Sequence, residues 1–156
     1  MAPAGTSAPL PRRAARWGAA LLLALFAASS YSQSARPAAE KLLRHLANGE
    51  IEAASQLSNV PKRRLDELAK YRAAVGEEQF KQIYSSYFQP LNPLVAEIAI
   101  GAHRLLIWRL GEAGNHLAGQ FYVEANGQFL MDDIPSETRN KLRQMLEDYR
   151  SGKLKL

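Results

Sequence analysis

The feature that most constrains folding is an export signal at the start of the chain. Arg12, Arg13 and Arg16 precede an uncharged apolar run, residues 17–28, and small polar residues follow this run. Charged, apolar and small-residue segments in this order are typical of a secretory signal peptide. The run is shorter than the roughly 20 residues that a membrane-spanning helix needs. We therefore interpret residues 1–34 as a cleaved signal peptide and predict a periplasmic or secreted bacterial protein without a stable membrane span.

Residues 35–156 remain as a single domain. They amount to about 120 residues, which is enough for a hydrophobic core. The chain contains no cysteine, so neither disulfides nor thiolate–metal sites hold this domain together. Small-residue pairs between Ala27 and Ser32 offer several cleavage points. An uncleaved signal that remains as a membrane anchor is the alternative.

The positive charge of the chain does not indicate a nucleic-acid partner. The sequence has 20 Lys/Arg and 15 Asp/Glu, but three of the basic residues belong to the predicted signal peptide. The only cluster in the remaining domain is at residues 62–64. Nucleic-acid-binding domains usually present a clustered basic face. We therefore predict no nucleic-acid partner.

The first half of the domain has a helical pattern. Leu42 and Leu46 belong to an apolar stripe at helical spacing, and Asn48–Gly49 ends this helix with residues that tolerate left-handed dihedral angles. A second short helix follows. Residues 61–88 are strongly helical, but their apolar stripes do not join smoothly across Gly76. We predict two helices that meet there, with a single kinked helix as the alternative, since an interior glycine costs only about 1 kcal/mol.

The second half has the pattern of an antiparallel sheet. Asn126–Gly127 is a strong hairpin signal, and as a two-residue loop it pairs Val123 with Leu130. Ser136 is a good N-cap for a final helix. Because helices and strands occupy separate parts of the chain, we predict an α+β fold, in which N-terminal helices pack on a four-stranded antiparallel meander and a C-terminal helix follows. The four strands are expected at residues 94–100, 103–110, 116–125 and 128–134.

Large apolar residues occur on both faces of the predicted sheet. Leu105 and Ile107 point to one face of their strand, and Leu106 and Trp108 point to the other. A sheet that is covered on one side only would alternate apolar and polar residues. We therefore expect helices on the concave face, and either the C-terminal helix or a partner subunit, as in a homodimer through the sheet face, on the other.

Residues 37–134 resemble NTF2-like domains, which are cystatin-like α+β cones. The segment Asn48–Glu50 followed by Ala53–Ala54 is similar to the helix–turn–helix opening of that family, and Gly127–Phe129 before Asp132–Ile134 is similar to its closing strand. The resemblance implies a curved sheet wrapped on helices around an apolar pocket, with dimerisation through the outer sheet face. It does not supply catalytic groups that can be placed residue by residue, and the chain adds a C-terminal extension.

The function that we predict is an exported binding or accessory protein, without a cofactor, for a small apolar ligand or a protein partner. Aromatic residues at helical and strand spacing are most often core residues, and the alternative is that they line a pocket or a contact surface. The candidates for ligand or partner binding are Tyr84, Tyr87, Trp108, Phe121 and Phe129.

Two other functions stay open. Asp132 and Asp133 are adjacent in a strand and point to opposite faces, so they do not form a dyad. One of them facing inward could act as the general base of an isomerase- or hydratase-like pocket enzyme, with Tyr122 as proton donor. The structural interpretation is that the pair ends the strand and helps to start the next helix. The remaining alternative is an inhibitor or immunity-type protein that contacts its target through the outer sheet face and Trp108.

The histidines do not indicate a metal site. If Leu110 pairs with Asn115 around the turn, His103 faces Tyr122 on the neighbouring strand. His116 then lies far from His103, so the two cannot share a metal ion.

Overall fold

The structure, a computed structural model, describes residues 33–89, 92–111 and 114–156. The chain divides into two units, Met1–Gln33 and Ser34–Leu156. The apolar run of the predicted signal peptide and its cleavage points lie outside the described residues. Among the described helices, none is both long and apolar enough to cross a membrane.

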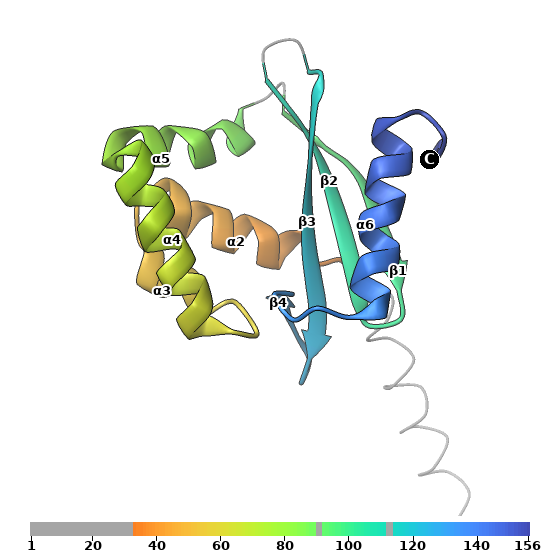
Figure 1. The fold of residues 1–156 in the computed structure, drawn as a ribbon, viewed down its shortest axis with the longest axis horizontal. Helices are drawn as coiled ribbons and strands as arrows, with labels where there is room; N and C mark the ends of the chain where they lie inside the picture. The colour runs from red at the N-terminus through yellow and green to blue at the C-terminus, as the bar shows by residue number, and fades with distance from the viewer. Residues whose placement is uncertain (1–32, 90–91, 112–113) are drawn as a thin grey trace, which may run out of the picture. The chain divides into compact units, whose positions relative to one another are not determined.

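The second unit has the predicted α+β order, with helices first, then four strands, then one helix (Figure 1). The helices of the first half are α2 (Arg36–Ala47), α3 (Ile51–Ser55), α4 (Pro61–Val75) and α5 (Glu77–Ser85), and a 3-10 turn, η2 (Ser86–Phe88), follows. The strands are β1 (Leu94–Ile100), β2 (His103–Leu110), β3 (His116–Ala125) and β4 (Gln128–Met131), and the last helix is α6 (Glu137–Arg150).

Local signals set the ends of these helices. Gly49 has φ 78°, and its left-handed conformation ends the turn between α2 and α3. Gly76, with φ 89°, separates α4 from α5, so the predicted break is confirmed and the kinked single helix is wrong. The Ser136 hydroxyl accepts a hydrogen bond from the Arg139 backbone N–H and caps α6 as predicted.

The sheet is the predicted antiparallel meander, with strand order β1-β2-β3-β4. Val123 pairs with Leu130 and Ala125 with Gln128, as expected for a two-residue Asn126–Gly127 loop. The pairing of β2 with β3 differs from the prediction by one residue, because Leu110 pairs with His116 and not with Asn115. The connection therefore holds five residues, and His103 faces Val123.

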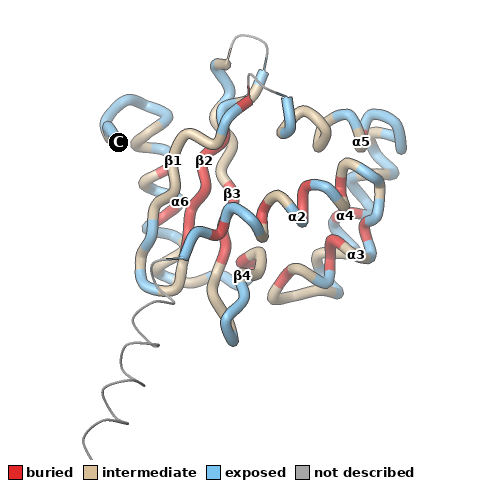
Figure 2. Tube along the Cα trace, turned by 180° about the vertical axis from the view of Figure 1, so that it is seen from behind, coloured by how far each residue is buried: buried red, intermediate tan, exposed pale blue. Residues whose placement is uncertain are grey.

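The two faces of the sheet have different covers, α2–α5 on one side and α6 on the other (Figure 1). We call the side toward α2 the inner face; Leu106, Trp108 and Tyr122 are buried there against residues of α2. On the outer face, Leu105 and Ile107 are buried against α6. Buried residues occur along the length of both β2 and α2 (Figure 2).

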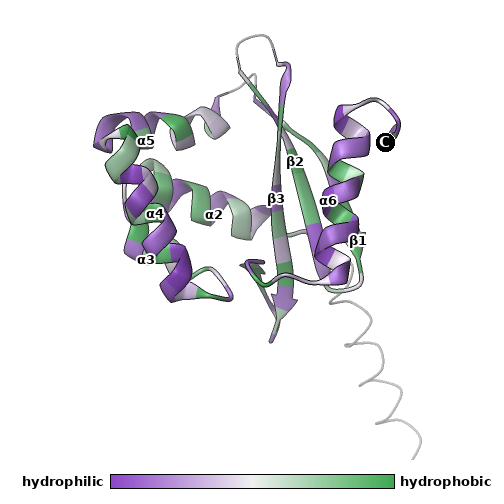
Figure 3. Cartoon of the chain, viewed as in Figure 1, coloured by the Kyte–Doolittle hydropathy of each residue, from purple (hydrophilic) through white to green (hydrophobic). Residues whose placement is uncertain are grey.

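The helix α6 accounts for the apolar outer face within a single chain. Leu142 and Leu146, on one side of α6, pack on that face, and the helix has both hydrophobic and hydrophilic residues along its length (Figure 3). Because α6 occupies the surface that the resemblance implies for dimerisation, a homodimer is not needed to bury this face, and it stays a prediction.

Candidate functional site

A cavity of about 140 Å³ lies between the four N-terminal helices and the inner face of the sheet. Five of its lining residues are apolar, and four carry polar atoms. The apolar residues are Leu42, Leu46, Ala54, Leu68 and Met131, and the others are Arg64, Tyr84, Tyr87 and Gln120.

Helical spacing explains why these side chains converge. Leu42 and Leu46 are one turn apart on α2, and Arg64 and Leu68 are one turn apart on α4. Residues four apart lie on the same face of a helix, so each pair points in one direction. The two helices and α5 turn these faces toward one another, and the cavity is the space that they leave unfilled.

Tyr84 and Tyr87 form the aromatic part of the wall. Their rings are stacked with centroids 6.3 Å apart, and Tyr87 meets Trp108 edge-on at 5.6 Å. The ring of Phe80 packs edge-on against that of Tyr84, with the ring centroids 4.9 Å apart. Burial raises the pKa of Tyr84 to about 12 and also raises the pKa of Tyr87, so both hydroxyls keep their protons at neutral pH.

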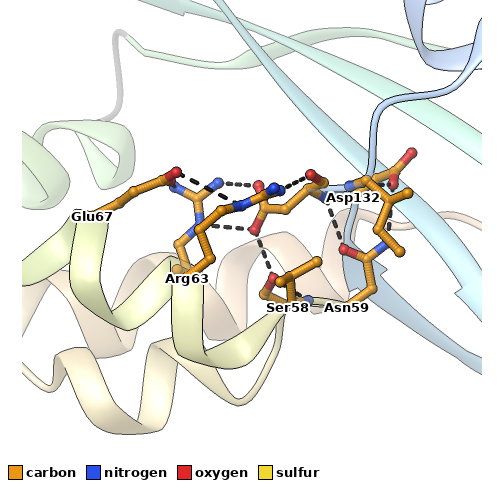
Figure 4. Close-up of polar contacts among 9 residues, drawn as sticks. Ser58, Asn59, Arg63, Glu67 and Asp132 are labelled. Atoms are coloured by element: carbon orange, nitrogen blue, oxygen red, sulfur yellow. Dashed lines mark hydrogen bonds and ion pairs between the residues drawn. The ribbon is translucent and has the colours of Figure 1, made fainter.

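A polar network fixes the side of the cavity where β4 ends, and Figure 4 shows it between α4 and the sheet. The Asp133 carboxylate accepts hydrogen bonds from the Arg64 guanidinium and, at 2.6 Å, from the Ser58 hydroxyl. Burial opposes the ionisation of Asp133, but the hydrogen bonds from Arg64 and Ser58 and the charges of Arg64 and Arg63 outweigh it and lower its pKa. The network thus holds Arg64 in the cavity wall.

The last strand is shorter than the predicted 128–134, because β4 ends at Met131, so Asp132 and Asp133 lie beyond it. Their carboxylates have different partners and form no dyad. The Asp132 carboxylate lies 3.1 Å from Nδ1 of His103, which is half-buried, and it accepts a hydrogen bond of 3.0 Å from the Asn59 side chain. The Asn59 side-chain oxygen accepts a hydrogen bond from the Asp133 N–H at 2.8 Å. Asp132 and Asp133 therefore tie the end of β4 to the loop between α3 and α4. Asp132 also accepts a hydrogen bond of 3.4 Å from the Ile134 backbone N–H, in the segment that leads to α6.

Tyr122 is buried on the inner face, and its hydroxyl has no hydrogen-bond partner among the described residues. Burial raises its pKa, and the neighbouring Tyr87 adds to the shift. Tyr122 pairs with Met131 of β4, which lines the cavity, so Tyr122 lies next to the cavity wall. A buried hydroxyl without a partner is uncommon in folded proteins, so it marks this region for a functional interpretation.

The structure brings together four of the five predicted binding residues. Tyr84 and Tyr87 line the cavity, Trp108 contacts Tyr87, and Phe129 packs on the same inner-face cluster. Phe121 lies on the outer face instead, against α6, where the Arg139 guanidinium lies 5.2 Å from the centre of its ring. It therefore belongs to the packing under α6.

Sequence analysis missed Arg64 and Gln120. The Arg64–Asp133 ion pair joins residues 69 positions apart, and no local pattern connects them. Gln120 lies between Ala118 and Tyr122 on the inner face of β3, and a polar residue between two residues that face the core was the one available signal. Its side-chain oxygen accepts a hydrogen bond of 2.8 Å from the Trp108 indole N–H.

Comparison with protein-family models, curated proteins and solved structures gives no match to this chain. The resemblance to NTF2-like domains therefore stays a prediction. Within the described part of the chain, no group of three or more His, Asp or Glu residues is placed to hold a metal ion.

Proposed function

We propose that this protein is an exported binding protein that holds a small ligand between its helices and the inner face of the sheet. The composition of the cavity wall carries the proposal. Ligand sites are mostly apolar hollows with a few polar groups that fix orientation. The described residues of this wall are apolar, aromatic or hydrogen-bonding, and none of them is Asp, Glu or His.

The size of the cavity sets the scale of the ligand. Its volume of about 140 Å³ is close to that of an engineered apolar cavity of about 150 Å³ that binds benzene. The cavity therefore suits a molecule of benzene size, or the compact end of a larger one. Tyr87 also lines a broader groove along α5 and the ends of β2 and β3, so it stands between the cavity and the surface.

The two alternatives find less support in the structure. A general base must face the substrate with a pKa near the working pH, whereas neither Asp132 nor Asp133 is among the described lining residues of the cavity. Asp133 is hydrogen-bonded and its pKa is lowered, and Asp132 is engaged by Asn59 and His103. An inhibitor would present a broad apolar contact surface. In the described part of the chain, the large exposed hydrophobic residues come instead from four separate segments, as Tyr71, Phe88, Ile134 and Leu156.

Native mass spectrometry of the protein purified from the periplasm tests both halves of the proposal. Ala35 is buried and its N–H donates a hydrogen bond of 2.7 Å to Glu97, so cleavage before Ser34 leaves the folded unit whole. We expect a mature chain that begins at Ser30, Tyr31 or Gln33. A chain that keeps residues 17–28 contradicts export with cleavage.

The same spectra report a bound molecule. Ala54 is fully buried in the wall, so Ala54→Met places a flexible apolar side chain in the cavity. We expect the wild type to carry a non-covalent mass that Ala54→Met loses, with circular dichroism confirming that the variant folds. Equal occupancy in both proteins, or bare protein in both, contradicts ligand binding at this site.

A further inference from the structure

We infer, on the basis of the proposed function, that the ligand is a compact uncharged molecule with a hydrogen-bond acceptor, such as a carbonyl oxygen, on an apolar body. The polar groups of the cavity wall that are not already engaged are all able to donate a hydrogen bond. A ligand that offers an acceptor satisfies all of them. A ligand that offers only a donor can satisfy the tyrosine hydroxyls, which also accept, but not the amide NH₂ of Gln120, and a purely apolar ligand leaves all of these groups without a partner.

The two tyrosine hydroxyls are the first donors. No hydrogen bond from within the described residues engages the hydroxyl of Tyr84 or that of Tyr87, although both rings line the cavity. Their stacked rings are held by Phe80 on one side and by Trp108 on the other. Donors that are fixed before binding lose little conformational freedom when a ligand arrives.

Gln120 supplies the third donor. Trp108 can only donate through its indole nitrogen, so the hydrogen bond of 2.8 Å assigns the side-chain oxygen of Gln120 to Trp108. The amide NH₂ of Gln120 is the group that is left for the cavity, and Gln120 is only 8 % exposed. A buried amide donor is costly without a partner, and a bound acceptor provides one.

The charges in the wall do not favour an ionised ligand. Arg64 is the charged residue that lines the cavity, and its guanidinium is engaged by Asp133 and lies 3.5 Å from Glu67. Its positive charge is therefore already offset, which removes the attraction for an anion. A cation would find no acidic side chain among the described lining residues, and burying an unpaired charge is expensive.

Three small aromatic probes of similar size separate the possibilities. Benzene is apolar, pyridine is an acceptor and pyrrole is a donor, and we propose to titrate each into the periplasm-purified protein at pH 7.5 and follow amide chemical shifts by NMR. The double variant Tyr84→Phe/Tyr87→Phe removes both hydroxyls and keeps both rings. Tyr149→Phe, on α6 at the outer face, is the matched control.

We expect benzene to bind the double variant at least as tightly as the wild type, because no hydroxyl is left without a partner, and pyridine to bind the double variant about tenfold more weakly than the wild type. Tyr149→Phe leaves both affinities unchanged. Two results overturn the acceptor preference: the ratio of pyridine to benzene affinity is the same in the double variant as in the wild type, or the wild type binds pyrrole more tightly than pyridine. In either case, binding of benzene still supports the cavity. The absence of shifts from all three probes at the residues that line the cavity overturns the proposed function as well.

Discussion

The two faces of the sheet are packed in different ways. On the outer face, Leu105 and Ile107 meet Leu142 and Leu146 of α6 in an apolar cluster. On the inner face, the neighbouring strand β3 contributes Gln120 and Tyr122, and next to them lies a cavity of about 140 Å³. The strands alternate between the two sides, so the contrast arises from neighbouring residues of the same backbone.

The contrast separates stability from function. Protein interiors are close-packed and contain few voids, so the outer face under α6 is what packing alone produces. The inner face departs from this rule, with an unfilled volume and, beside it, the buried Tyr122 hydroxyl, which lacks a hydrogen-bond partner among the described residues. Departures of this kind are expected at functional sites. We therefore assign anchoring to α6 and binding to the inner face.

Two leucine truncations compare the faces directly and have the largest expected effect. Leu146 is 4 % exposed within the outer cluster, whereas Leu46 is 3 % exposed but borders the cavity. We expect Leu146→Ala to lower the free energy of unfolding by about 4 kcal/mol, and Leu46→Ala by about 2 kcal/mol, because a side chain beside a void loses fewer contacts. Urea denaturation measures both, and equal losses contradict the difference between the faces.

Asp133 tests the polar edge of the cavity. We expect Asp133→Asn to cost about 3 kcal/mol, because it removes the buried ionic partner of Arg64 and leaves the partly buried guanidinium with only the exposed Glu67. Asp66→Asn removes a carboxylate of an exposed ion pair with Lys62 and is the control, with an expected cost below about 1 kcal/mol. Similar costs for the two substitutions would show that the network does not stabilise the fold.

The pH dependence of unfolding follows from the same residue. The pKa of Asp133 is lower in the folded state than its ordinary value of 3.8, so its ionised form stabilises the fold. This contribution is fully present above pH about 4 and is lost as pH falls through the folded-state pKa. The wild type should therefore lose more stability than Asp133→Asn between pH 5 and pH 2. Parallel curves for the two proteins contradict the assignment.

Gly119 tests how tightly α6 is packed. A Cβ at this position of β3 would overlap the Leu146 side chain and would lie 3.2 Å from Leu105. We expect Gly119→Ala to cost about 2 kcal/mol through overpacking. In a Leu146→Ala background the overlap is removed, so the same substitution should cost close to nothing. A cost that is the same in both backgrounds contradicts close packing under α6.

The substitution Tyr122→Phe has the smallest expected effect on stability, and the sign of the change in the free energy of unfolding is what distinguishes the interpretations. The buried Tyr122 hydroxyl has no partner among the described residues, so Tyr122→Phe removes an unsatisfied group and keeps the ring. We expect the free energy of unfolding to rise by about 1 kcal/mol. Urea denaturation with Tyr149→Phe as the reference measures this, and a loss of stability in Tyr122→Phe contradicts the description of the inner face.

Local signals in the sequence were sufficient for most of the fold. Gly76 divides two helices and Asn126–Gly127 sets the register of β3 with β4, because both act through backbone conformation over a few residues. The register of β2 with β3 was wrong by one residue, since the glycine-rich connection has no single preferred length. A slip of one residue reverses which side chains face each other, and it hid the contact between His103 and Asp132.

The candidate site was harder to predict from the sequence than the fold. The aromatic residues Tyr84 and Tyr87 were found because their spacing placed them on one helical face. The pairing of Arg64 with Asp133 depends on tertiary structure, and polar residues at the ends of elements, such as Ser58 and Asn59, were the one hint of it. A cavity forms where the packed side chains leave a space unfilled, and the hydrophobic pattern of a sequence does not show where this happens. The export signal and the NTF2-like resemblance stay predictions.

A crystal structure under xenon pressure tests the central assignment most directly, because xenon enters apolar cavities of this size. We predict a xenon site beside Leu42 and Leu68, between the helices and the inner face, and none between the sheet and α6. Xenon under α6, or an inner face that protein side chains fill so that it takes up none, contradicts the account.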